Sequence, residues 1–71
     1  MNKPLTPFGL RLKELGIRQS ALAKQLSVSP GLVSQWARGY TGISAKNAVA
    51  IDKATVGLIS KEFLLPDLFG G

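Results

Sequence analysis

The stretch from Gln19 to Arg38 constrains the fold of this chain more than any other part of it. Six positions carry the residue types that two short helices need when they cross steeply over a turn of about three residues. In chain order these are Gln19, Ala23, Leu26, Val28, Val33 and Trp36. Ala23 is small enough for a close crossing, and the apolar residues surround the turn. The spacing therefore predicts a helix-turn-helix.

Capping residues predict where the two helices of this motif begin and end. The first should span residues 19–26, and the second should begin at Pro30 with Ser29 as its N-cap. A residue before proline is pushed into an extended conformation, which is the conformation an N-cap adopts. Gly39 should end the second helix. Ser27 stands where glycine is usual, so we expect a left-handed serine that costs on the order of 1 kcal/mol.

Helices are also predicted on both sides of the motif. Residues 7–15 should form the first helix, capped by Thr6 and ended by Gly16. Its apolar residues Phe8, Leu12 and Leu15 recur at helical spacing and should be buried. Trp36 should also be a core residue. A further helix is expected over residues 45–54, capped by Ser44.

The remainder of the chain is open to two interpretations. Ser60 can cap a short fifth helix that Pro66 ends, so that Leu68 and Phe69 lead into a terminal Gly70-Gly71. Residues 55–65 also contain β-branched and apolar residues that could form a β-hairpin, giving an α+β fold. We prefer the helical, all-α fold, because a long run without Gly or Pro follows Ser44.

Composition limits the classes of function. The 71 residues suffice for one compact domain, spanning residues 1–71, and carry a net charge of +5. Such a positive field favours a polyanionic partner, with nucleic acid ahead of an acidic membrane. Cysteine and histidine are absent, so we expect no disulfide, no metal and no cofactor. The four acidic residues are scattered, so we expect no enzyme activity.

The sequence also bears on location. Met1 to Pro4 show no apolar segment of a signal peptide. No uncharged apolar run approaches the ~18 residues that a membrane span needs. We therefore expect a cytoplasmic protein with no membrane or small-molecule partner.

The outward face of the second motif helix is expected to contact base edges. In a helix-turn-helix the N-terminal part of this helix reads the major groove. Gln35 can pair bidentately with adenine, and Arg38 with guanine or a phosphate. The predicted base contacts are Pro30, Gly31, Ser34, Gln35 and Arg38.

Phosphate contacts are expected on both sides of this helix, because helix N-termini and nearby cations bind phosphates. Before it lie Arg18, Gln19 and Ser20, at the start of the first motif helix. After it lie Tyr40, Thr41, Ser44 and Lys46.

The last part of the chain is rich in apolar residues. The set Leu58, Phe63, Leu65, Leu68 and Phe69 either packs onto the first and fourth helices or forms a dimer interface. Palindromic operators usually mirror a two-fold axis of the protein, so a homodimer on DNA is expected.

The motif and two later segments resemble a known family. The runs QSALAK and VSQW, followed by AIDKAT and PDLF, are similar to the Cro repressors of phages and prophages, and more narrowly to the YdaS-like branch. The resemblance covers about residues 18–69 and departs at Ser27 and at Pro30-Gly31. It implies a five-helix, λ-repressor-like domain that represses transcription by binding double-stranded DNA. It also implies a location in the cytoplasm of a bacterial host, where the protein would be associated with the nucleoid through DNA. The branch also includes antitoxins, so a module that acts mainly through protein binding is the alternative.

Overall fold

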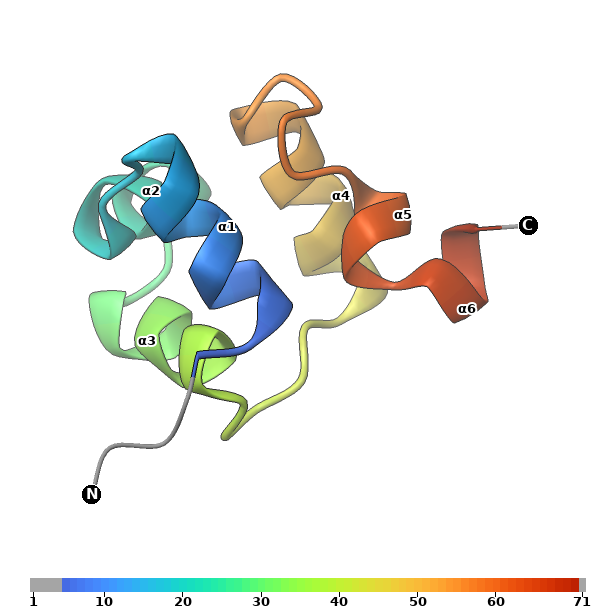
Figure 1. Cartoon of the computed structure of the whole chain (residues 1–71). Coiled ribbons are helices and arrows are strands. Elements are labelled where there is room, and N and C mark those ends of the chain that lie inside the picture. Colours follow the sequence, from blue (N-terminus) through green and yellow to red (C-terminus); the bar gives the residue numbers. More distant parts are fainter. Residues whose placement is uncertain (1–4, 71) are drawn as a thin grey trace.

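Six helices account for most of residues 5–70, which are the residues that the computed structural model describes (Figure 1). They are α1 (Pro7–Leu15), α2 (Gln19–Leu26), α3 (Pro30–Arg38), α4 (Ala45–Ala54), α5 (Lys61–Leu64) and α6 (Pro66–Phe69). The described part of the chain contains no strand, so residues 55–65 do not form the hairpin that was the alternative. The fold is all-helical, as expected.

Of the first four helices, α1 and α3 have local caps at both ends and α4 has one at its start. The hydroxyl groups of Thr6, Ser29 and Ser44 each accept a hydrogen bond from a backbone N–H in the first turn of α1, α3 and α4, at 3.2, 3.2 and 3.3 Å. Each cap accepts from a backbone N–H for which the helix itself offers no acceptor. Gly16 and Gly39 end α1 and α3 in the left-handed conformation. The predicted bounds of these four helices are confirmed.

The core lies where α1, α2, α3 and α4 meet. Its buried residues are Phe8, Leu12, Leu22, Ala23, Val33, Trp36, Ala37, Ile51 and Ile59. The rings of Phe8 and Trp36 meet edge to face, with their centroids 6.3 Å apart. The core positions predicted for Phe8, Leu12 and Trp36 are confirmed, and Leu15 packs against this cluster while partly exposed.

The start of α1 is bonded directly to the end of α3. The backbone N–H of Thr6 donates to the carbonyl oxygen of Ala37 at 2.8 Å, and the Thr6 hydroxyl donates to the same oxygen at 2.9 Å. Gly9 lies against Ala37 so closely that a Cβ atom on it would come within 2.7 Å of that oxygen. These contacts hold the C-terminal end of α3 firmly against α1.

A buried threonine organises the connection from α4 to α5. The Thr55 hydroxyl donates to the carbonyl oxygen of Ile51 at 2.8 Å and accepts from the backbone N–H of Ile59 at 3.1 Å. Ile59 is thereby drawn into the core, where its side chain is fully buried. Val56, the first of the three residues between Thr55 and Ile59, has a φ of 54° and is 89% exposed.

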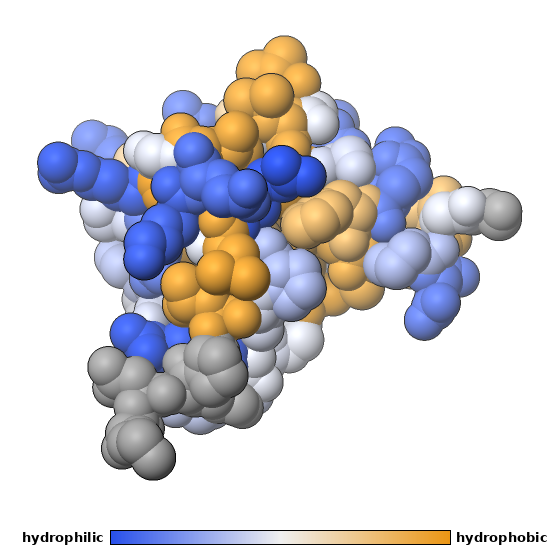
Figure 2. Space-filling model, in the orientation of Figure 1, coloured by the Kyte–Doolittle hydropathy of each residue, from blue (hydrophilic) through white to orange (hydrophobic). Residues whose placement is uncertain are grey.

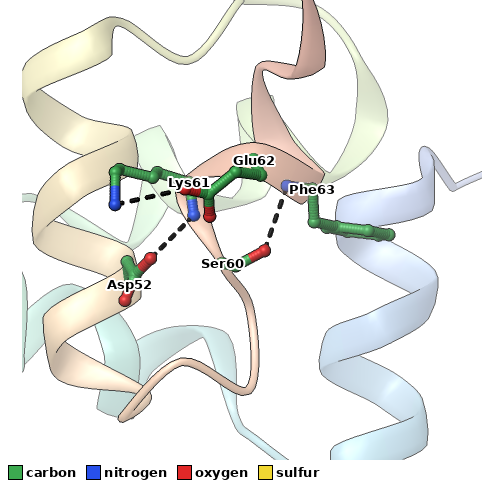
Figure 3. A network of polar contacts seen from close by, with 5 residues as sticks. All are labelled: Asp52, Ser60, Lys61, Glu62 and Phe63. Atoms are coloured by element: carbon green, nitrogen blue, oxygen red, sulfur yellow. Dashed lines mark hydrogen bonds and ion pairs between the residues drawn. The ribbon is translucent and has the colours of Figure 1, made fainter. Parts of the chain in front are cut away.

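The short helix α5 depends on contacts from outside itself (Figure 3). The Asp52 carboxylate accepts from the backbone N–H of Lys61 at 2.9 Å, and the Ser60 hydroxyl accepts from that of Phe63 at 3.1 Å. A carboxylate at a helix N-terminus is favoured by the helix dipole.

The expected count of five helices is roughly right, because residues 5–70 contain four long helices and two short ones. Pro66 ends α5, as predicted, but it also occupies the first position of α6, which includes Leu68 and Phe69. Proline suits this first position because its φ is preset and its missing N–H is not needed there. Helix α6 lies beside α5 at one edge of the molecule (Figure 1).

Candidate nucleic-acid interface

Helices α2 and α3 are joined by the tight turn that the sequence predicts. Ser27 adopts the left-handed conformation, with φ of 59° and ψ of 39°. The backbone N–H of Val28 donates to the carbonyl oxygen of Ala23 at 3.0 Å and closes the end of α2. Ala23 is 1% exposed, so its small side chain lies inside the contact between the helices. The left-handed serine is confirmed.

Helix α3 divides into a buried face and an outward face. Val33, Trp36 and Ala37 are buried on one side. Projected at 100° per residue, the five predicted base-contact residues occupy one continuous arc on the other side. Of these, Pro30, Gly31 and Gln35 are exposed, while Ser34 and Arg38 are partly buried. The structure therefore brings these five residues onto one surface.

The residues predicted to contact phosphate are at the starts of α2 and α4 and in the connection after α3. Arg18 is exposed and immediately precedes α2, followed by the partly buried Gln19 and the exposed Ser20. Ser44 and Lys46 are exposed at the start of α4, where the Ser44 hydroxyl already accepts from the N–H of Asn47.

Tyr40 and Thr41 lie in the connection from α3 to α4. Both side chains are exposed, and the backbone N–H of Tyr40 donates to the carbonyl oxygen of Gln35 at 2.9 Å. The Thr41 hydroxyl donates to the side-chain oxygen of Gln35, also at 2.9 Å. The sequence analysis did not predict the contact between Thr41 and Gln35. The one sequence feature that points to it is Gly39, which turns the chain back after α3.

The five residues of the expected dimer interface belong to three parts of the structure, namely two grooves and helix α6. Leu58 is 60% exposed and lines a shallow groove of about 260 Å³ together with Ile17 and Ala21. Phe63 and Leu65 line a second groove, of about 460 Å³, beside Trp36 and Ile43. The space-filling view shows hydrophobic residues interrupted by hydrophilic ones on the face that it draws (Figure 2).

The two remaining residues of that set are on α6. Leu68 is 61% exposed, whereas Phe69 is partly buried with the Lys61 ammonium group 5.9 Å from its ring centre. Phe63 is covered in a similar way by the Arg11 guanidinium group, at 5.2 Å.

Among residues 5–70, no helix combines the length and the apolar character needed to cross a membrane. The same residues contain no group of three or more acidic side chains placed to hold a metal ion.

Comparison with known proteins finds one matching family and two similar proteins. A family model described as "Bacterial toxin YdaS" matches residues 13–71. The putative transcriptional regulator YdaS of Escherichia coli K12 is 44% identical over 50 residues, which are 70% of this chain and 51% of that protein. Repressor protein C2 of Salmonella phage P22 is 46% identical over 44 residues, or 62% of this chain and 20% of the repressor.

The matches cover only part of each relative. The chain spans about half the length of the first of these relatives and a fifth of the second. No solved structure matches the chain significantly. The family description contains the word toxin, whereas antitoxins were what the resemblance suggested. The family match nevertheless covers the helix-turn-helix from α2 onwards and the C-terminal helices, and the chain belongs to the YdaS family.

Proposed function

We propose that this protein is a sequence-specific DNA-binding regulator of transcription, of the Cro repressor type, which reads the major groove with α3. The observation that supports this proposal most strongly is the division of α3 into two faces. Val33, Trp36 and Ala37 fix one face in the core, while the opposite face presents polar and small residues without a large apolar side chain. A helix held rigidly with such a face outward suits a groove about 12 Å wide.

The surroundings of α3 suit a polyanion. The net charge is +5, and Arg18 and Lys46 are exposed at the starts of α2 and α4. The N-termini of these two helices add donors and a positive dipole end for phosphate. In this proposal Arg18, Gln19, Ser20, Tyr40, Ser44 and Lys46 contact the DNA backbone.

The relatives support the same function. One is named a putative transcriptional regulator and the other a phage repressor. On this basis we assign the whole chain to one λ-repressor-like domain. We further propose that it acts as a dimer on a palindromic operator, with exposed apolar residues of the C-terminal part, such as Leu58 and Leu68, in the contact between protomers.

The decisive experiment is selection of binding sites from random duplex DNA, followed by titration of the recovered site and of a random duplex at several salt concentrations. We expect an enriched sequence with two-fold symmetry, bound 10³-fold or more tightly than random DNA, on the order usual for specific sites. Affinity should fall steeply with salt, because phosphate contacts release counterions. Recovery of no common sequence, together with salt-independent binding, would overturn the proposal.

Gln35→Ala tests the role of α3 within that experiment. It should relax the preference at one base pair by about 1–3 kcal/mol while binding to random DNA changes little. Gln25→Ala is the matched control, because Gln25 is also an exposed glutamine but lines the groove beside Leu58. Equal losses on specific and random DNA would show that Gln35 does not read a base.

A second candidate function is a module that acts mainly by binding another protein. The tip of the α4–α5 connection favours it, because Val56 is 89% exposed and Leu58 is 60% exposed. A strained, exposed apolar residue is often placed for recognition. The variant Val56→Ser/Leu58→Ser should then lose a partner protein yet bind DNA normally. If the variant instead loses DNA binding and no partner protein is lost, DNA-binding regulation remains the function. The tip would then belong to the contact between protomers.

A further inference from the structure

Thr41 and Gln35 form a side-chain pair beside the outward face of α3. The Thr41 hydroxyl donates to the Oε1 atom of Gln35 at 2.9 Å, and both side chains are exposed. We propose that Thr41 is a positioning residue that orients the Gln35 amide for reading a base, and that it is not a phosphate contact. This inference rests on the proposed DNA-binding function.

The backbone places Thr41 over Gln35 without any help from DNA. Gly39 ends α3 with φ of 80°, and the N–H of Tyr40 then donates to the carbonyl oxygen of Gln35 at 2.9 Å. The chain is thereby turned back along the last turn of α3. Beyond Thr41, Ile43 packs against the core. The connection is therefore anchored on both sides of Thr41.

Hydrogen-bond counting decides between the two roles of Thr41. A threonine hydroxyl has a single hydrogen to donate, and phosphate oxygens only accept. In the structure this hydrogen is donated to Gln35. Contact of the hydroxyl with a phosphate would require breaking the bond to Gln35, so one hydroxyl cannot serve both.

The bond to Thr41 leaves the reading groups of Gln35 available. An amide oxygen has two lone pairs, of which Thr41 uses one, and both amide hydrogens stay free. Adenine offers a donor at N6 and an acceptor at N7, which match the free lone pair and one amide hydrogen. The bonded side chain has also lost much of its rotamer freedom before binding, which reduces the entropy lost on the DNA. Water competes for this bond in the free protein, but a closed interface strengthens it.

The test compares Thr41→Val, which keeps the shape and removes the donor, with Thr41→Ser, which keeps the donor. Each is titrated against the selected site, the site altered at the base pair that Gln35 reads, and a random duplex. Thr41→Val should lower discrimination between the first two by about threefold to tenfold, the entropy of one freed side chain. Thr41→Ser should keep most of the discrimination that the unaltered protein shows. Binding of the random duplex should be unchanged.

The double variant Gln35→Ala/Thr41→Val separates coupling from independent action. It should discriminate no worse than Gln35→Ala alone, because Thr41 acts through Gln35. A uniform loss on all three duplexes, or multiplied effects in the double variant, would overturn the inference and favour a phosphate contact. If the unaltered protein binds no duplex selectively, the proposed function itself fails, which is a different result.

A measurement on the free protein tests the pair without DNA. The NMR order parameter of the Gln35 side-chain amide should fall in Thr41→Val and stay high in Thr41→Ser. Equal order parameters in all three proteins would mean that Thr41 does not hold Gln35, and the inference would then be wrong however the protein binds DNA.

Discussion

Ser27 shows how a single residue can carry backbone strain that the fold tolerates. Its φ of 59° lies in the left-handed region, which disfavours residues with a Cβ atom. Its side chain is exposed, and it caps α2 through backbone contacts that any residue could make. The strain is therefore set by the chain path between α2 and α3, which the turn requires.

Ser27→Gly is accordingly expected to stabilise the protein. Removal of the Cβ atom relieves the strain, and after the extra entropy of glycine in the unfolded chain we expect a gain of about 0.5–1 kcal/mol. Thermal unfolding should shift upward by several degrees, about 4–8 °C per kcal/mol in a domain of this size. Ser20→Gly, at an exposed position inside α2, is the control and should lower the midpoint. A lower midpoint for Ser27→Gly would contradict this account.

Thr55 is the buried polar residue on which the α4–α5 connection depends. Thr55→Val keeps the shape of the side chain but leaves the N–H of Ile59 and the carbonyl oxygen of Ile51 without their hydroxyl partner. An unsatisfied buried polar group costs about 1–3 kcal/mol, so the free energy of unfolding should fall by that amount. Denaturant titration measures it. Thr55→Ser keeps the hydroxyl and should lose less; if it loses more than Thr55→Val, packing of the methyl group dominates instead.

At the scale of the elements, the packing of α1 on α3 depends on one glycine. A Cβ atom on Gly9 would meet the carbonyl oxygen of Ala37 at 2.7 Å and the Cβ atom of Ala37 at 3.1 Å. Gly9→Ala should therefore push the helices apart and destabilise the fold by about 1–3 kcal/mol, although alanine favours helix more than glycine does. Chemical denaturation of the two proteins compares their stabilities.

Gly31→Ala is the matched control on the outward face of α3. Its new Cβ atom would meet only the Ser29 hydroxyl, at 3.9 Å, which is ordinary contact. The variant should gain up to about 1 kcal/mol from helix propensity. If α3 lies deep in the major groove, the same variant should bind DNA more weakly. Opposite stability effects of Gly9→Ala and Gly31→Ala are required; equal effects would refute the packing argument.

For the whole molecule, the arrangement of charge predicts which cations contribute to DNA affinity. Lys46 is exposed in the first turn of α4, near the proposed interface, while Lys53 is exposed in its last turn. Each phosphate contact contributes about 0.9 to the slope of log affinity against log salt concentration. Lys46→Gln should reduce this slope by about that amount, and Lys53→Gln should not. Equal reductions would show that net charge matters and position does not.

Much of the fold was determined by local sequence signals. The caps at Thr6, Ser29 and Ser44 and the stops at Gly16 and Gly39 fix both ends of α1 and α3 and the start of α4, because each acts within one helical turn of its own position. The outward arc of α3 was equally predictable, since helical periodicity alone places its residues on one side. The family was predicted from the runs QSALAK, VSQW, AIDKAT and PDLF, and the family match confirmed it.

The tertiary structure decided what depends on residues distant in sequence. The hydrogen bonds from Thr6 to Ala37 span about thirty residues, and the hydrogen bond from Lys61 to Asp52 joins two helices. No local sequence pattern predicts them. The same holds for the separation of Leu58 from Phe63 into two grooves. Thr41 is the clearest case, because the sequence shows a polar loop residue beside a recognition helix, and only the path of the backbone after Gly39 brings its hydroxyl to Gln35.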